Sequence, residues 1–120
     1  MGSPVMQFQL LAKYPEKAAE FYCNLFQWSV DSNNSLGYRA LKTNSGQGID
    51  GGIWPAPPEG HAMVQLFVQV ENVAATADNA KSLGGNIVMP PQVLPDGDEM
   101  AIILDPEGIP VGLFRPAQSR

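Results

Sequence analysis

The sequence predicts an α+β fold made of two similar halves in tandem, each with the element order β-α-β-β-β. The first observation behind this prediction is an amphipathic helix at residues 15–27, where apolar side chains recur at i, i+3, i+4 and i+7. The apolar positions are Ala18, Phe21, Tyr22 and Leu25, and Cys23 falls on the opposite, polar face. The second is another helix at residues 73–83. The third is that one alternating strand precedes each helix and short β-rich runs follow it.

In the first half, residues 5–12 alternate as a strand does. We expect Phe8, Leu10 and Ala12 to face the helix, which leaves Gln7, Gln9 and Leu11 on the other side. After the helix we expect strands at residues 28–30, 37–43 and 48–54, with a turn at residues 31–35. The proline-rich residues 55–60 are expected to link the halves.

In the second half, residues 63–70 alternate in the same way, with Gln65, Phe67 and Gln69 on the side opposite Leu66, Val68 and Val70. Asn72 is expected to cap the second helix, and Gly84–Gly85 to end it. Three more strands are predicted, at residues 87–89, 100–104 and 110–115. Pro90–Pro91 is expected to end the first of them, and Asp105–Gly108 fits a type I turn before the last.

Several residues recur at equivalent places in the two halves. Gln7 and Gln65 begin their strands, and Trp54 of GGIWPA is equivalent to Phe114 of VGLFRPA. We therefore predict one domain at residues 5–116, with module one at about 5–57 and module two at about 62–116. Short tails, 1–4 and 117–120, flank it.

The amino-acid composition argues against several classes of function. The net charge of −5 argues against binding to nucleic acid or to an anionic membrane surface. No apolar run approaches the ~20 residues of a membrane span. Cys23 is the one cysteine, which favours the cytoplasm, and the one histidine, His61, rules out most zinc sites built from several His or Cys ligands.

Three motifs together resemble the vicinal oxygen chelate superfamily, the glyoxalase/bleomycin resistance protein/dioxygenase group. They are PEKAAEFYCNLFQW, ENVAATADNAKSLGG with the following prolines, and DPEGIPVGLF. The resemblance covers residues 5–116. It implies two βαβββ modules whose strands curl into cup-like mixed sheets with the helices outside, and frequent homodimers.

The resemblance also implies positions for a divalent metal ion. Relatives carry His, Glu or Gln at the start of each module's first strand and Glu on its last strand. The corresponding residues here are Gln7 and Gln65, then Gly52 and Gly112. If the alignment with the superfamily pattern shifts by two residues, Gln9 or Gln69 takes the first-strand position instead. Two neutral amides and two glycines would not hold a catalytic metal, so we expect no metal and no other cofactor.

Strand alternation independently predicts the side chains on the cup side. The expected ligand-binding residues are Gln7, Gln9, Trp54, Gln65, Phe67, Gln69 and Phe114. Such a wall of amides and rings suits a neutral or aromatic organic ligand. The same glutamines would equally suit a solvated or dimer-contact face, and Trp54 and Phe114 would suit a packed core.

Other polar groups are weaker candidates. Tyr38 and Arg39 are neighbours on a strand, so only one can face the cup, and we expect Arg39 at the surface. His61 is expected in a loop and Cys23 to be unreactive. Asp105 and Glu107 belong to a turn, and no catalytic residue can be assigned.

The sequence therefore predicts a metal-free, cytoplasmic and homodimeric protein that binds a small organic molecule in its β-cup, without nucleic acid or membrane partners. One alternative is a metal-dependent lyase, isomerase or dioxygenase of the same superfamily, with Gln7 as a residual ligand. Another is an interaction module whose cup is filled by its own side chains.

Overall fold

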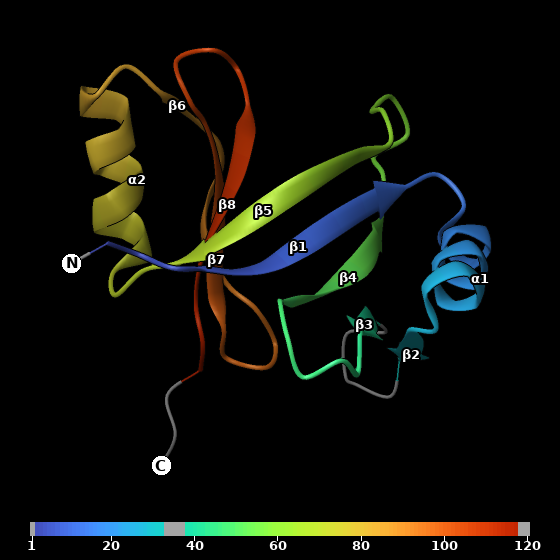
Figure 1. Ribbon diagram of the computed structural model, residues 1–120. Helices are drawn as coiled ribbons and strands as arrows, with labels where there is room; N and C mark the ends of the chain where they lie inside the picture. Colours follow the sequence, from blue (N-terminus) through green and yellow to red (C-terminus); the bar gives the residue numbers. More distant parts are fainter. Residues whose placement is uncertain (1, 33–37, 118–120) are drawn as a thin grey trace. The chain divides into compact units, whose positions relative to one another are not determined.

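The computed structural model describes residues 2–32 and 38–117 and divides into two compact units. The N-terminal unit is Gln7–Gln65, and the C-terminal unit is Leu66–Arg120 together with Met1–Met6. Most of the predicted 31–35 turn, and the start of the predicted strand at residues 37–43, lie outside the described residues. Each unit combines one helix with four strands (Figure 1).

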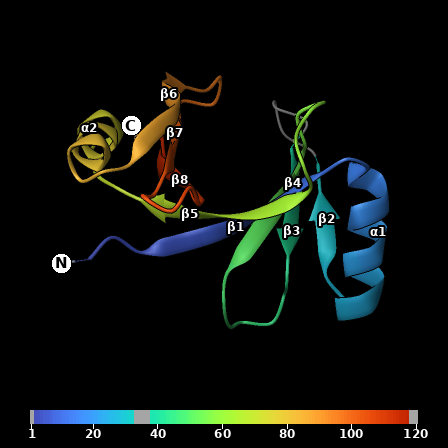
Figure 2. The same cartoon turned by 90° about the horizontal axis from the view of Figure 1, so that it is seen from above.

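The N-terminal unit has the sheet order β2-β3-β4-β1, in which β1 and β4 are parallel and the other pairs antiparallel. Helix α1 packs on one face of this sheet (Figure 2). The elements are β1 (Val5–Ala12), α1 (Pro15–Phe26), β2 (Ser29–Asp31), β3 (Arg39–Lys42) and β4 (Asp50–Pro55).

The C-terminal unit repeats the arrangement with the order β5-β8-β7-β6, in which β5 and β8 are parallel. The elements are β5 (Met63–Gln69), α2 (Val73–Ser82), β6 (Asn86–Val93), β7 (Glu99–Leu104) and β8 (Pro110–Arg115). The predicted α+β class and the twofold β-α-β-β-β order are therefore confirmed. Within the described residues neither helix is long and apolar enough to cross a membrane.

The face of α1 that packs on its sheet matches the predicted one only in part, with Ala18 packed there as expected. Ala19 is buried against Leu41 and Ile53, with Cys23 packed beside it, whereas Phe21 and Leu25 are more than half exposed. Small side chains let the helix approach the sheet closely, so the alanines and Cys23 take the contact that the larger residues were expected to make. The assignment of Cys23 to the polar face was therefore wrong, while Phe8, Leu10 and Ala12 do face the helix.

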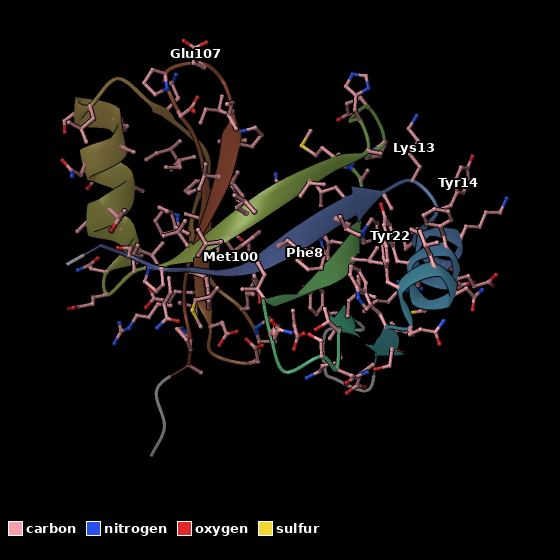
Figure 3. The ribbon with its side chains drawn as sticks, in the orientation of Figure 1. Phe8, Lys13, Tyr14, Tyr22, Met100 and Glu107 are labelled. Atoms are coloured by element: carbon pink, nitrogen blue, oxygen red, sulfur yellow. The ribbon has the colours of Figure 1, made fainter. Side chains whose placement is uncertain are left out.

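Rings at the end of α1 form a continuous cluster on the helix side of the sheet. The Trp28 ring lies 5.9 Å from Tyr22, 5.1 Å from Phe26 and 5.8 Å from Phe8 between ring centroids. Figure 3 labels Phe8 on β1 and Tyr22 on α1. Aromatic pairs at these separations stabilise packing beyond the area they bury. The cluster anchors the helix to the strand before it.

Strand β6 continues through Pro90 and Pro91, which were expected to end it. The pairing of β6 with β7 is irregular there, with register shifts between Ile87 and Met89 and between Met89 and Gln92. Proline lacks the N–H that a sheet ladder needs and is tolerated on an edge strand or at a bulge. Both conditions hold in this unit, where β6 is the outermost strand.

Helix α2 begins and ends as its sequence predicts. The Asn72 side-chain Oδ1 accepts a hydrogen bond from the Ala75 N–H at 2.9 Å, which is an N-cap. The Gly85 N–H donates to the Ala80 carbonyl at 2.8 Å, and Gly84 has a φ of +100° that suits glycine. Val73 and Ala77 are buried against Ala101 and Leu113 on the sheet.

We expect Asn72→Ala to lower the free energy of unfolding by about 1 kcal/mol, because it leaves a helix N–H without its acceptor. Urea denaturation followed by circular dichroism would measure the loss. Asn72→Asp keeps a capping oxygen and is the matched control. Equal urea midpoints for the alanine variant and the parent chain would show that the cap does not stabilise α2.

Candidate ligand-binding site

The face of the N-terminal sheet that turns away from α1 carries an ordered set of side chains. In the central row of this face, Gln9 on β1 pairs with Gly52 on β4, which pairs with Ala40 on β3. In the next row, Leu11 pairs with Trp54. Arg39 pairs with Ile53, so Tyr38, one residue earlier, lies across from Trp54.

Tyr38 fills the space that a side chain at position 52 would take. A Cβ added to Gly52 would collide with the Tyr38 hydroxyl and its ring carbons. The hydroxyl donates a hydrogen bond of 2.6 Å to Oε1 of Gln9, and the Tyr38 and Trp54 ring centroids are 5.7 Å apart. Gln9, Tyr38 and Trp54 therefore form one group, which we call the tyrosine site.

Of the neighbours Tyr38 and Arg39, Tyr38 is the one on this face. Arg39 lies on the helix side of the sheet, where its Nη2 is 3.5 Å from Oε1 of Glu16 on α1. Because the Glu16 side chain is mostly exposed, this ion pair contributes little to stability. The positive charge of Arg39 is thus directed away from the tyrosine site.

The tyrosine site is made of uncharged groups. Burial raises the pKa of the Tyr38 phenol to about 12, since the phenolate would lose hydration. Tyr38 is therefore protonated at neutral pH and acts as a hydrogen-bond donor, not as a general base. Glutamine and tryptophan do not titrate in this range, so the site has no acid–base pair of its own.

Two of the predicted glutamines, Gln7 and Gln65, lie outside the tyrosine site. Gln7 pairs with Asp50, one row beyond Gln9, and the Asp50 carboxylate accepts hydrogen bonds from the backbone N–H and the hydroxyl of Thr43. Gln65 is buried, and its Nε2 lies 4.0 Å from Sδ of Met63.

The C-terminal unit brings together the other three predicted residues. Phe67 on β5 pairs with Gly112 on β8, and Gln69 pairs with Phe114. The Phe67 ring lies over Gly112, where an added Cβ would be 2.5 Å from the ring, and the Phe67 and Phe114 centroids are 6.4 Å apart. This face is more apolar than the tyrosine site, because Ile102 on β7 pairs with Gly112 and Met100 pairs with Phe114. Figure 3 labels Met100.

The sequence did not assign Tyr38 to the site, although the signal was present. An antiparallel β3–β4 pair puts alternate residues on one face, so Tyr38, Ala40, Gly52 and Trp54 share a face once the register is known. A large ring two residues from alanine, facing a strand with glycine, has room to lie across the sheet. The sequence alone does not give the register between β3 and β4, which decides that these residues meet.

The positions that the resemblance implies for metal ligands hold two glutamines and two glycines, which offer few donors for a divalent cation. The register pairs Gln9, not Gln7, with Gly52, and Phe67 with Gly112. Phenol and phenyl rings fill the space beside both glycines, and one amide oxygen is already bonded to Tyr38. Zn²⁺ needs three or four protein donors and Ca²⁺ six or more oxygens. Across residues 2–32 and 38–117, no group of three His, Cys, Asp or Glu side chains could hold a metal.

The chain belongs to the Glyoxalase/Bleomycin resistance protein/Dioxygenase superfamily, which it matches over residues 5–113. It is 32% identical over 105 residues to CFP32 of Mycobacterium tuberculosis, a glyoxylase by name, and the match covers 82% of this chain and 40% of CFP32. The CFP32 protein of Mycobacterium bovis matches equally. The chain thus spans about two fifths of the length of these curated relatives.

Solved structures with the same fold include protein BH1468 of Bacillus halodurans, with a TM-score of 0.72 and 9% identity, covering 100% of this chain and 99% of that one. A Streptomyces coelicolor methylmalonyl-CoA epimerase with bound 2-nitronate-propionyl-CoA has a TM-score of 0.63 and 15% identity, covering 95% of this chain and 97% of that one. At these identities the likeness shows the fold alone.

We expect Tyr38 to ionise late when the folded protein is titrated with base and followed by phenolate absorbance near 295 nm. Because its folded pKa is raised above the ordinary value of 10.0, Tyr38 stabilises the fold below pH 10, and this contribution is lost as the pH rises towards 12.

Tyr38→Phe should remove the late component and the associated loss of stability. Tyr14→Phe, which removes an exposed phenol at the start of α1 (Figure 3), should retain both. Circular dichroism at each pH shows which points refer to the folded chain. A late component that survives in Tyr38→Phe would contradict the buried hydrogen-bonded phenol.

Proposed function

We propose that the chain is a metal-free member of its superfamily that binds a small neutral or aromatic organic molecule on sheet faces turned away from the helices. The observation that carries the proposal is the Tyr38 hydroxyl, which occupies the space beside Gly52 and is bonded to Gln9. A protein that used this position for a metal ligand would need that space.

The chemistry of the side chains supports a neutral ligand. The tyrosine site offers amide and phenol groups beside an indole that is 39% exposed, with no charged member. Rings supply contact area and stacking, while a few polar groups orient the ligand. The proposed ligand-binding residues are the predicted set with Tyr38 added: Gln7, Gln9, Tyr38, Trp54, Gln65, Phe67, Gln69 and Phe114.

We also propose a homodimer in the cytoplasm. The dimer follows from the resemblance to the superfamily, and the compartment from the single cysteine, Cys23. Sedimentation at several protein concentrations tests the dimer directly, with the mass of one chain, 12.9 kDa, as the reference.

A second candidate is a metal-dependent lyase, isomerase or dioxygenase of the superfamily. The glyoxylase name of CFP32, at 32% identity, favours it. This function would require Tyr38 to leave Gly52 and further donors to be supplied. Its signature would be turnover of a 2-oxoaldehyde adduct or a catechol that appears only when a divalent metal is added.

We expect a panel of neutral aromatic compounds at millimolar concentration to include some that raise the unfolding temperature, and Ni²⁺, Zn²⁺ and Mn²⁺ to leave it unchanged. Binding to the folded state stabilises it by an amount that grows with ligand concentration over Kd, so micromolar binders should register clearly. The measurement is thermal unfolding with each compound.

Trp54→Ala should weaken the response of the compounds that bind, because it removes the exposed ring. Glu107→Ala, in the exposed turn before β8 (Figure 3), is the control. A rise of the unfolding temperature with one of the metals, and with none of the aromatic compounds, would support the enzyme alternative and contradict the proposal.

A further inference from the structure

The tyrosine site fixes the orientation of the Gln9 amide. Oε1 of Gln9 accepts the Tyr38 O–H at 2.6 Å, so the nitrogen of the same amide faces another way. Within the described residues, no buried side-chain nitrogen or oxygen lacks a hydrogen-bond partner. Nε2 of Gln9 has no partner among those residues and must therefore be accessible from outside the sheet.

Nε2 lies beside an aromatic surface. Gln9 pairs with Gly52, and Trp54, two residues further along β4, is 39% exposed and contacts the Tyr38 ring. Gly52 and Ala40 at the centre of this face carry small or no side chains, beside the rings of Tyr38 and Trp54. An N–H donor and an indole thus adjoin on the same surface.

We infer that the tyrosine site recognises the carbonyl oxygen of a planar aromatic compound, with Nε2 of Gln9 as the donor and Trp54 as the stacking surface. Tyr38 is a positioning residue, because it holds the amide with its nitrogen outward. This inference rests on the proposed function and adds to it the chemical class of the ligand.

The charges near the site favour an uncharged acceptor. Asp50 is one row from Gln9 on the same face, and Lys42, two residues beyond Ala40, lies in the same row as Asp50. The two opposite charges leave no net charge on this side of the site. A ketone, lactam or quinone oxygen accepts a hydrogen bond and carries no charge. The uncharged N–H of the Gln9 amide is a suitable donor for it.

The test compares 1-indanone with indane, two flat bicyclic compounds that differ in one carbonyl. Trp28→Phe is the background, because it leaves Trp54 as the one tryptophan of the chain. Trp28 belongs to the aromatic cluster on the helix side, so its replacement does not touch the tyrosine site. Titration of Trp54 fluorescence gives both Kd values.

We expect 1-indanone to bind about five-fold more tightly than indane, the discrimination that one neutral hydrogen bond provides. In Trp28→Phe with Gln9→Glu, an oxygen remains for Tyr38 but the N–H donor is gone, so the preference should disappear. Gln47→Glu in the exposed β3–β4 loop adds the same charge away from the site and should keep it. Gln9→Met is the second variant if Gln9→Glu does not fold.

Tyr38→Phe in the same background tests the positioning role. It removes the bond that orients the amide but no group that touches the ligand carbonyl, so we expect the ratio of the indane Kd to the 1-indanone Kd to fall in this variant. The readout for this variant is the ratio of the two Kd values.

Equal binding of the two compounds in the Trp28→Phe background, or a preference that survives both Gln9 variants, would overturn the inference and leave the proposed function standing. If neither compound changes Trp54 fluorescence and no compound of the thermal panel binds, the proposed function fails as well.

Discussion

The structure depends on rings that lie over glycines in the last strand of each module. Phe8 lies over Gly51 and Tyr38 over Gly52, on opposite faces of the N-terminal sheet, and Phe67 lies over Gly112 in the C-terminal unit. An added Cβ would meet ring atoms at 2.5 Å at both Gly51 and Gly112. Substitution of a small residue by a larger one in a closely packed core lowers the free energy of unfolding by roughly 1–3 kcal/mol. The glycines therefore set which side chains cover each face.

This constraint links packing to function. On the helix side, the Phe8 ring joins the aromatic cluster that anchors α1. On the other side, the Tyr38 phenol lies over Gly52 and bonds to Gln9. The same local solution, a ring laid on glycine, stabilises one face and determines the chemistry of the other. Burial then keeps the phenol protonated, with a pKa of about 12.

Much of the fold could be predicted from local patterns. Alternation located the strands and the sides of Phe8 and Leu10, and Asn72 marked the start of α2 correctly. The predicted contact face of α1 was wrong in part because apolar periodicity does not say that Ala19 and Cys23 pack closer than Phe21 and Leu25. The predicted end of β6 was wrong because the sequence does not show that this strand lies at the edge of its sheet. Pro90 and Pro91 are tolerated there.

The candidate site could be predicted only in part. Alternation selected Gln9, Trp54, Phe67 and Phe114, but pairing between strands decides which residues meet, and pairing depends on register. Gly52 faces Gln9 and not Gln7, and Gly112 faces Phe67 and neither Gln65 nor Gln69. Tyr38 follows from the β3–β4 register in the same way.

The rings of Tyr38 and Phe67 lie over Gly52 and Gly112, two positions at which the resemblance implies metal ligands. The most direct test of whether they exclude a metal is the metal content of the purified chain, prepared without chelators and measured by elemental mass spectrometry. If these rings exclude a metal, Ni, Zn, Fe and Mn together should fall far below one atom per chain. One firmly held atom of any of them per chain, lost together with ligand binding on chelation, would contradict this expectation.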